Sequence, residues 1–181
     1  DGTWDTYSQA DALLLSFSAG DGYEMATETG ANVEFKGDLK SGTVTKAITY
    51  NETDPWAIDG GSRFNLVANP YAAYINANTN ADGDCFLDAN NLSMLDTGTH
   101  QAFYAWDGAA NSGNGEYKTI TNATAAKYMA PGQAFMVGSK SGGGTLSFTT
   151  AMQTTGTTDD FYTGDVMDPD DRAELFIGLN Q

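Results

Sequence analysis

The sequence holds one cysteine and one histidine among its 181 residues, and it has no long apolar run. Cys85 has no partner for a disulfide within the chain, and it is expected as a small buried residue rather than a nucleophile. His100 alone cannot build a metal centre of several histidines, and its position favours a loop residue before a strand. The apolar run at residues 12–15 is far too short to span a membrane. These absences argue against a disulfide scaffold, a histidine-based metalloenzyme and a helical membrane protein.

Positive charge is also scarce. Eight lysine and arginine residues stand against 24 aspartate and glutamate residues, which gives a formal net charge of −16. Such a chain has little charge with which to neutralise phosphates, so nucleic acid and anionic membranes are not expected as partners. The acidic balance favours cation binding, solubility in salt, or a surface whose charges are simply solvated.

Turn residues, by contrast, are abundant, with 21 glycines and many Asn, Thr, Ser and Asp residues between short apolar runs. This punctuation is typical of many short strands. Leu146 and Phe148 alternate with polar neighbours, which predicts a strand with one face on a core. The expected strands cover residues 22–27, 31–36, 43–49, 63–67, 102–106, 116–120, 133–138, 145–149 and 172–179. With one short helix expected over 85–95, the pattern predicts an all-β protein, an antiparallel β-sandwich.

A weak internal repeat runs through the chain. Residues 19–25 read AGDGYEM and residues 131–137 read PGQAFMV, and a second alternating stretch follows each of them, at 33–35 and 146–148. The unit could be a duplicated glycine turn with two strands, or it could arise by chance. We therefore expect a single domain over residues 1–181, built from two related halves at about 1–60 and 61–181 if the repeat is a true duplication.

Four segments carry a resemblance to a known family. Residues 63–71 read RFNLVANPY, 104–108 read YAWDG, 130–137 read APGQAFMV, and 144–153 read GTLSFTTAMQ. In this order they resemble the β-rich module that precedes the C-terminal sorting domain in many secreted and cell-surface proteins of the Bacteroidetes, exported by type IX secretion. Members of that family usually have Trp at the position of Phe64, Gly at that of Ala68 and Pro at that of Ala72. The resemblance implies a secreted or cell-surface, non-catalytic module for adhesion or polysaccharide capture.

A polar loop follows the first of these segments and imitates part of a calcium site. Alternating oxygen ligands and the glycine after Asp82 resemble the first half of an EF-hand loop. Counted from Asn78 as position one, position twelve should hold an acidic residue that binds calcium with both oxygens, but it is Ala89, and Asp88 comes one residue early. A calcium loop of another type stays open, and so does a polar loop that only starts the helix. The candidate Ca²⁺ ligands are Asn78, Asn80, Asp82, Asp84 and Asp88.

Aromatic side chains supply the candidate ligand platform. Trp56 lies in a turn-rich stretch between Asp54 and Asp59, so it is the expected exposed aromatic, together with Tyr74. Trp106 lies on an alternating strand and is expected in the core. The glycines of residues 141–145, which read SGGGT, are expected to form a hairpin turn rather than a phosphate-binding loop.

Three functions are consistent with these patterns. The first is a binding module for polysaccharide or another surface ligand, helped by calcium. The second is a self-assembling subunit of an extracellular filament or layer, whose strand edges, at 174–180 or 3–7, would pair with another copy. The third is an accessory domain of a secreted polysaccharide-degrading enzyme. A hydrolase domain itself would need two carboxylates at catalytic separation, and the sequence singles out no such pair. The sequence favours the first.

Overall fold

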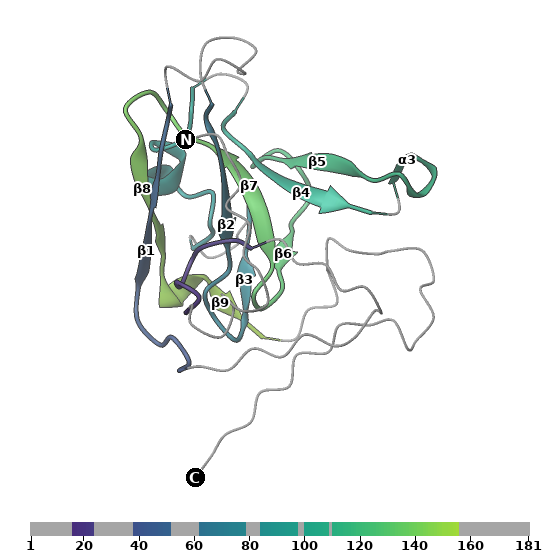
Figure 1. Ribbon diagram of the computed structural model, residues 1–181. Helices are drawn as coiled ribbons and strands as arrows, with labels where there is room; N and C mark the ends of the chain where they lie inside the picture. Colours follow the sequence, from purple (N-terminus) through teal and green to yellow (C-terminus); the bar gives the residue numbers. More distant parts are fainter. Residues whose placement is uncertain are drawn as a thin grey trace.

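The computed structural model describes residues 16–23, 38–51, 62–78, 84–97, 100–108 and 110–155 (Figure 1). Within these residues the chain is all-β, with antiparallel sheets and two very short helices. The expected strands at 31–36 and 172–179, and most of the one at 22–27, lie outside the described residues. The fold class predicted from alternation and turn residues is therefore confirmed.

The strands are short, which suits a chain with so many turn residues. Their bounds are β1 Val44–Ile48, β2 Phe64–Ala68, β3 Tyr74–Asn76, β4 Phe103–Asp107, β5 Glu116–Ile120, β6 Tyr128–Met129, β7 Ala134–Gly138, β8 Gly144–Phe148 and β9 Gln153–Thr154. Six of them, β1, β2, β4, β5, β7 and β8, lie where the sequence predicts strands. Strand β2 ends at Ala68, as expected just ahead of Pro70, which has no N–H to donate to a ladder.

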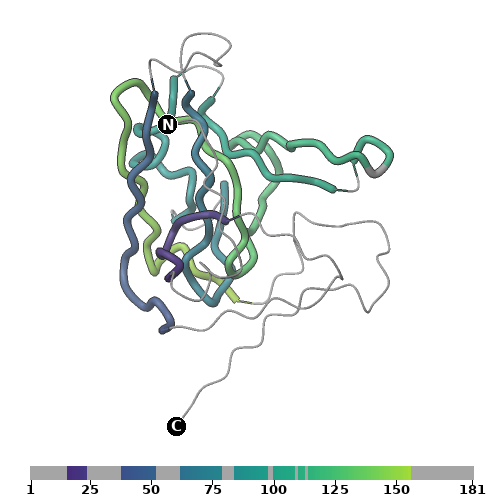
Figure 2. Tube along the Cα trace, viewed as in Figure 1, coloured from purple at the N-terminus to yellow at the C-terminus, as the bar shows by residue number. Residues whose placement is uncertain are grey.

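The strands of the described residues form three antiparallel sheets. The largest has the order β2-β7-β4-β5, a second pairs β1 with β8, and a third has the order β6-β3-β9. Figures 1 and 2 show β1 and β8 side by side at one side of the body, while β4 and β5 extend away from it as a hairpin. The hairpin therefore presents much of its surface to solvent.

The core lies between the four-stranded sheet and the β1–β8 pair, and Phe86 is at its centre. Its ring stacks on Phe148 of β8, with centroids 5.2 Å apart, and meets Phe135 and Phe103 edge-on at 4.9 and 6.2 Å. All four rings are 2% exposed or less. Burying each such side chain contributes about 1.5–3 kcal/mol, so this cluster is a main source of stability.

The expected helix over 85–95 is much shorter in the structure. Helix α2 covers only Ala89–Leu92, and Phe86 lies in the turn before it. The Asp88 side chain accepts a hydrogen bond from the N–H of Asn91, which makes it the N-cap. The helix ends at once because Ser93 is its C-cap and asparagine is a poor helix former. The expected length is therefore wrong, although the helix itself is present.

The glycine-rich turn after β7 does not form a hairpin. Strand β7 pairs with β2 and β4, whereas β8 pairs with β1, so the turn carries the chain from one sheet to another. Gly143 has a φ of +80°, and a Cβ there would lie 2.8 Å from the Ile48 carbonyl oxygen. Glycine is needed here because the turn passes closely over the end of β1.

The internal repeat has a structural counterpart in its turns. The N–H of Asp21 bonds to the carbonyl of Ser18 with Gly20 at φ +88°, and that of Gln133 bonds to Ala130 with Gly132 at φ +69°. Each turn leads into an antiparallel pairing with β2, on opposite sides of that strand. The second stretch of the first copy, at 33–35, lies outside the described residues, so duplication stays a prediction.

Candidate functional site

The outer face of the four-stranded sheet carries an apolar and aromatic surface. Residues that are directly opposite in neighbouring strands share a face, and the ladder places Leu66 opposite Met136, Met136 opposite Tyr104, and Trp106 opposite Tyr117. In β2, β4 and β7 the residues that alternate with these are buried and face the core: Val67, Phe103, Ala105, Phe135 and Val137. We call this surface the aromatic face; its members are Phe64, Leu66, Tyr104, Trp106, Tyr117 and Met136.

Trp106 and Tyr117 form the exposed end of the aromatic face, on the projecting hairpin. Their residues are 40% and 52% exposed, and their rings meet edge-on with centroids 5.0 Å apart. The indole lies against Gly115, where a Cβ would be 2.1 Å from the Trp106 ring. Gly115 has a φ of +76° and carries no side chain, so the ring is supported from one side by backbone.

The sequence-based placement of Trp106 in the core is wrong. Phe103 and Ala105 are the buried residues of β4, and Trp106 follows with its side chain on the other face. Aromatic residues lie on both faces of this strand, so alternation alone could not choose between them. The sequence did contain a feature that predicts the exposed pair. Residues 111–115 read NSGNG between two alternating runs, a pattern typical of a hairpin, and such a hairpin brings Trp106 beside Tyr117.

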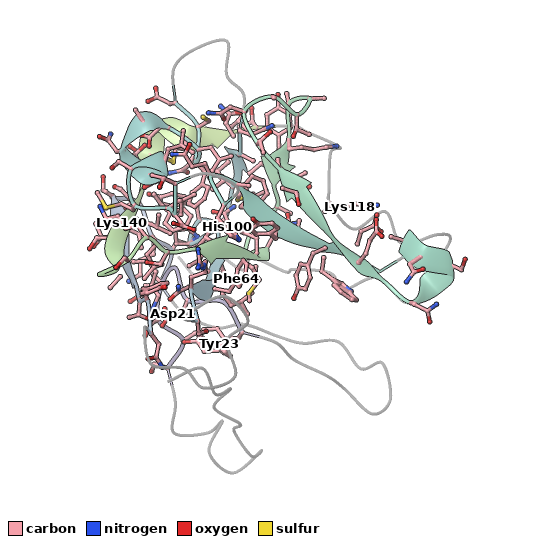
Figure 3. The ribbon with its side chains drawn as sticks, turned by 90° about the horizontal axis from the view of Figure 1, so that it is seen from above. Asp21, Tyr23, Phe64, His100, Lys118 and Lys140 are labelled. Atoms are coloured by element: carbon pink, nitrogen blue, oxygen red, sulfur yellow. The ribbon has the colours of Figure 1, made fainter. Side chains whose placement is uncertain are left out.

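A second aromatic group continues the face toward β2. Phe64 is 46% exposed, and its ring meets those of Tyr104 and His100 edge-on, with centroids 5.5 and 5.7 Å apart. Figure 3 shows Phe64 and His100 close together beside the sheet. The aromatic face therefore extends from β2 to β5.

His100 is held by a charged cluster at the border of this face. Its Nδ1 lies 3.0 Å from Oδ2 of Asp96, which also forms an ion pair with Arg63. The Arg63 guanidinium lies 5.6 Å from the centroid of the Tyr50 ring. Burial raises the pKa of the Tyr104 hydroxyl, and nearby Asp96 also raises it while Arg63 lowers it. These contacts fix the loop before β4, where the sequence predicted His100 to lie.

The opposite face of the hairpin is polar. Lys118 forms an ion pair with Glu116, two residues along the same strand, and its Nζ lies 3.9 Å from Asp107. The hydrogen bond to Glu116 raises the pKa of Lys118. Figure 3 shows Lys118 on this projecting hairpin. The hairpin is thus aromatic on one side and charged on the other.

The two aromatic residues proposed from sequence do not join this face. Tyr74 begins β3 in the three-stranded sheet, opposite Thr154, and is half-buried. Trp56 lies outside the described residues. The structure thus locates the exposed aromatic surface on strands β2, β4 and β5, away from the sheet that holds Tyr74.

Asn78, the first candidate calcium ligand, has a structural role. It is 2% exposed, and its Nδ2 donates to the carbonyls of Thr121, Thr124 and Ala125 at 2.8, 3.1 and 3.2 Å. Its Oδ1 accepts from the N–H of Lys127 at 2.8 Å. The side chain thus fastens the 121–127 loop to the end of β3.

Asn69 and Asn91 act in the same way. Asn69 donates to carbonyls of Ala73, Met129 and Ala130, while Asn91 donates to those of Phe86 and Ser147 and accepts from the Ser147 N–H. Both are 2% exposed or less. Asn69, Asn78 and Asn91 are hereafter the buried asparagines.

The other candidate calcium ligands are not brought together as a site by the described residues. Asp88 caps helix α2, and Asp84 is exposed, with its backbone carbonyl accepting from Asn76. Asn80 and Asp82 lie outside the described residues. Across the described ranges no group of three His, Cys, Asp or Glu side chains is placed to hold a metal ion.

Cys85 is buried, at 5% exposed, as the sequence predicted. Burial raises the pKa of its thiol, and the negative charges of Asp88 and Asp84 raise it further. The thiol is therefore held in its protonated, unreactive form at neutral pH.

Comparison with known proteins gives a family without a function. The family model described as "Domain of unknown function (DUF8693)" matches residues 10–173. No curated protein matches the chain, and no solved structure matches it. In the part of the chain that the structure describes, no helix has the length and apolar character needed to cross a membrane.

Proposed function

Because the chain belongs to the family described as "Domain of unknown function (DUF8693)", whose description names no activity, we propose a function from its own surface. The protein is a non-catalytic binding module that holds a polysaccharide against the aromatic face. It works outside the cell or on the cell surface, in adhesion or as an accessory domain of a polysaccharide-degrading protein.

The observation that carries this proposal is the exposed pair of Trp106 and Tyr117. Large aromatic side chains are normally buried in strands, and each can bury 150–250 Å² when it finds a partner. Here both residues remain about half exposed on a hairpin that projects from the body, and the indole is supported by Gly115. Exposed rings held by backbone suit the apolar face of a sugar ring, because little side-chain entropy is lost on binding.

The net charge restricts the class of polysaccharide that the protein can bind. With −16 on the chain, an acidic polysaccharide would be repelled, so the proposed ligand is an uncharged one. Three of the described carboxylates are used in ion pairs or as a cap: Asp21 with Lys46, Asp96 with Arg63, and Asp88 at the start of α2. These three side chains therefore have structural roles.

The extracellular setting rests on the resemblance to modules of proteins exported by type IX secretion. The four segments that carry it lie in or beside β2, β4, β7 and β8. Within them, Asn69 bonds to three carbonyls. The Tyr71 hydroxyl donates its one proton to the Phe148 carbonyl, 2.6 Å away, with the Gly42 carbonyl also within reach at 3.0 Å. These residues support the fold, and exposed residues of the same segments, Phe64 and Trp106, supply part of the proposed ligand surface.

Calcium stays a prediction for the loop at 78–88. The side chains of Asn78 and Asp88 already bond to backbone, so an ion there would depend on Asn80, Asp82 and Asp84 with backbone carbonyls. Repeating a binding assay with calcium and with a chelator tests this part separately. An unchanged affinity and an unchanged melting temperature would refute a role for calcium.

The test of the binding function is affinity electrophoresis of the full chain in gels that contain neutral or acidic polysaccharides. We expect retardation by at least one neutral polysaccharide, and a loss of about tenfold or more in affinity for Trp106→Ala and Tyr117→Ala. Leu39→Ala is the matched control, because Leu39 is 53% exposed but belongs to another part of the surface. Binding that survives the double substitution at Trp106 and Tyr117 would refute the proposed site, and no retardation in any neutral gel would refute the function.

A further inference from the structure

Strand β5 is at the edge of the four-stranded sheet. The order β2-β7-β4-β5 leaves its outer side without a neighbouring strand among the described residues, and Glu116, Tyr117, Lys118 and Thr119 are all exposed. An exposed edge strand presents N–H and C=O groups that can pair with another strand. The side chains of β5 decide which strand can pair with this edge and in which register.

A second copy of β5 can pair with the first in only a few registers. In an antiparallel ladder, two residues that lie opposite each other either both point their N–H and C=O groups at the partner strand or both point them away from it. Along one strand these two kinds of residue alternate, so a residue of β5 can lie opposite only a residue of the same kind in the second copy. A two-fold pairing of β5 must therefore be centred on a residue. Centring on Glu116 or on Lys118 places that charge opposite itself. Centring on Thr119 places Lys118 opposite Ile120, and centring on Ile120 places Lys118 opposite Asn122, so neither register pairs opposite charges.

The remaining register, centred on Tyr117, is self-complementary. It places Glu116 opposite Lys118 of the partner subunit and Lys118 opposite Glu116 of the partner subunit. The same two side chains form an ion pair within one strand, so they lie on one face and have matching reach. Opposite charges across a ladder favour a register, and like charges disfavour it.

We propose that two copies of this chain pair through β5, antiparallel and centred on Tyr117. The two four-stranded sheets then form one continuous sheet of eight strands. Opposite residues share a face, so Tyr117 meets the partner subunit's Tyr117 and the two aromatic faces join into one. This inference goes beyond the proposed function, and it holds whether or not the joined face binds a polysaccharide.

The strength of the pairing follows from the charges and the size of the contact. A five-residue edge makes a small interface, so the dimer forms only at high protein concentration. The net charge of −16 on each copy opposes association, and salt screens this long-range repulsion more than the contacts at the edge. Association should therefore strengthen as salt rises from low to physiological concentration.

The test is sedimentation velocity of the full chain over a range of concentrations, with charge reversals on β5. We expect concentration-dependent dimers for the unchanged protein, and a dimer constant weakened about tenfold by Glu116→Lys or Lys118→Glu, since each creates two like-charge pairs. The double swap Glu116→Lys with Lys118→Glu should restore association. An equimolar mixture of the two single variants should also associate, because each then faces the opposite charge.

The matched controls are Asp38→Lys and Lys40→Glu, which make the same changes in net charge at exposed residues away from the hairpin. They should change the dimer constant only by the effect of the altered net charge on long-range repulsion. A protein that stays monomeric at the highest concentration refutes the proposal. So does a dimer that both single reversals leave unchanged, or one that the double swap fails to restore. Polysaccharide retardation of the same variants shows separately whether the proposed function stands.

Discussion

The substitution Asn78→Leu measures what a buried asparagine contributes to this fold. Asn78 is 2% exposed, and leucine has the same branched side chain without polar atoms, so the change removes the hydrogen bonds, while its bulkier methyl groups add some crowding to the loss. The Nδ2 group has two protons for the carbonyls of Thr121, Thr124 and Ala125, and Oδ1 accepts a third bond from Lys127.

Three hydrogen bonds at about 1 kcal/mol each give a loss of about 3 kcal/mol. The loss rises if the carbonyls stay unpaired, and it falls if water enters, since Asn122 and Ala123 in the same loop are exposed. For a chain of this length, about 3 kcal/mol corresponds to roughly 6–12 °C in melting temperature. Urea and thermal unfolding followed by circular dichroism would measure both quantities.

The control is Asn90→Ala, because Asn90 is exposed and makes one long bond, at 3.3 Å, to Asp88. We expect its effect to stay within about 0.5 kcal/mol. The same measurement with calcium and with a chelator separates the structural role of Asn78 from the role of an ion ligand. A loss below about 1 kcal/mol, or a loss that appears only with calcium, would refute the reasoning.

Three further predictions concern the hairpin, the core and the thiol. Gly115→Ala should destabilise the protein by roughly 1–3 kcal/mol and shift the tryptophan emission, because its Cβ would lie 2.1 Å from the Trp106 ring at a φ of +76°; an unchanged melting temperature and spectrum would contradict this. Burial raises the pKa of Tyr71 above the value of about 10 in the unfolded chain, so stability is fully present below pH 10 and falls as pH rises further. Tyr71→Phe should flatten that alkaline fall, and an equal slope in both proteins would count against it. Cys85, whose thiol pKa burial raises, should react with a thiol reagent at pH 8 on the order of 100-fold more slowly in the native than in the unfolded protein; equal rates would show that the site is open.

The strands that the sequence predicts well are those with a simple alternation. Strand β5 runs over Glu116–Ile120, the expected range, and β8 buries Leu146 and Phe148 as alternation requires. Strands β3, β6 and β9 were not predicted because they have only two or three residues, too few to show a period. The glycines before β8 correctly predicted a turn, but not that the turn connects two different sheets. The sheet that β8 joins is decided by its pairing with the distant strand β1, which local sequence does not show.

The candidate site was harder to predict for a related reason. Alternation tells that neighbouring residues face opposite sides, but the side that becomes the core is decided by the packing of other strands. Trp106 was expected in the core because it lies in the resembling motif on an alternating strand, but the small Ala105 occupies the buried position. In the same way, Asn78 has the chemistry of an ion ligand, and only the fold reveals that the 121–127 loop supplies its partners.

The pairing of β1 with β8 has a consequence for how the chain reaches its native state. Val44 lies opposite Phe148, and the Tyr71 hydroxyl bonds to the carbonyl of that same phenylalanine. The β1–β8 sheet cannot close until nearly all of the described chain is available, and contacts between such distant residues slow folding toward milliseconds or longer. During that interval the apolar strands are exposed to other molecules. The net charge of −16 would then keep unfolded copies apart long enough for each to close its own core.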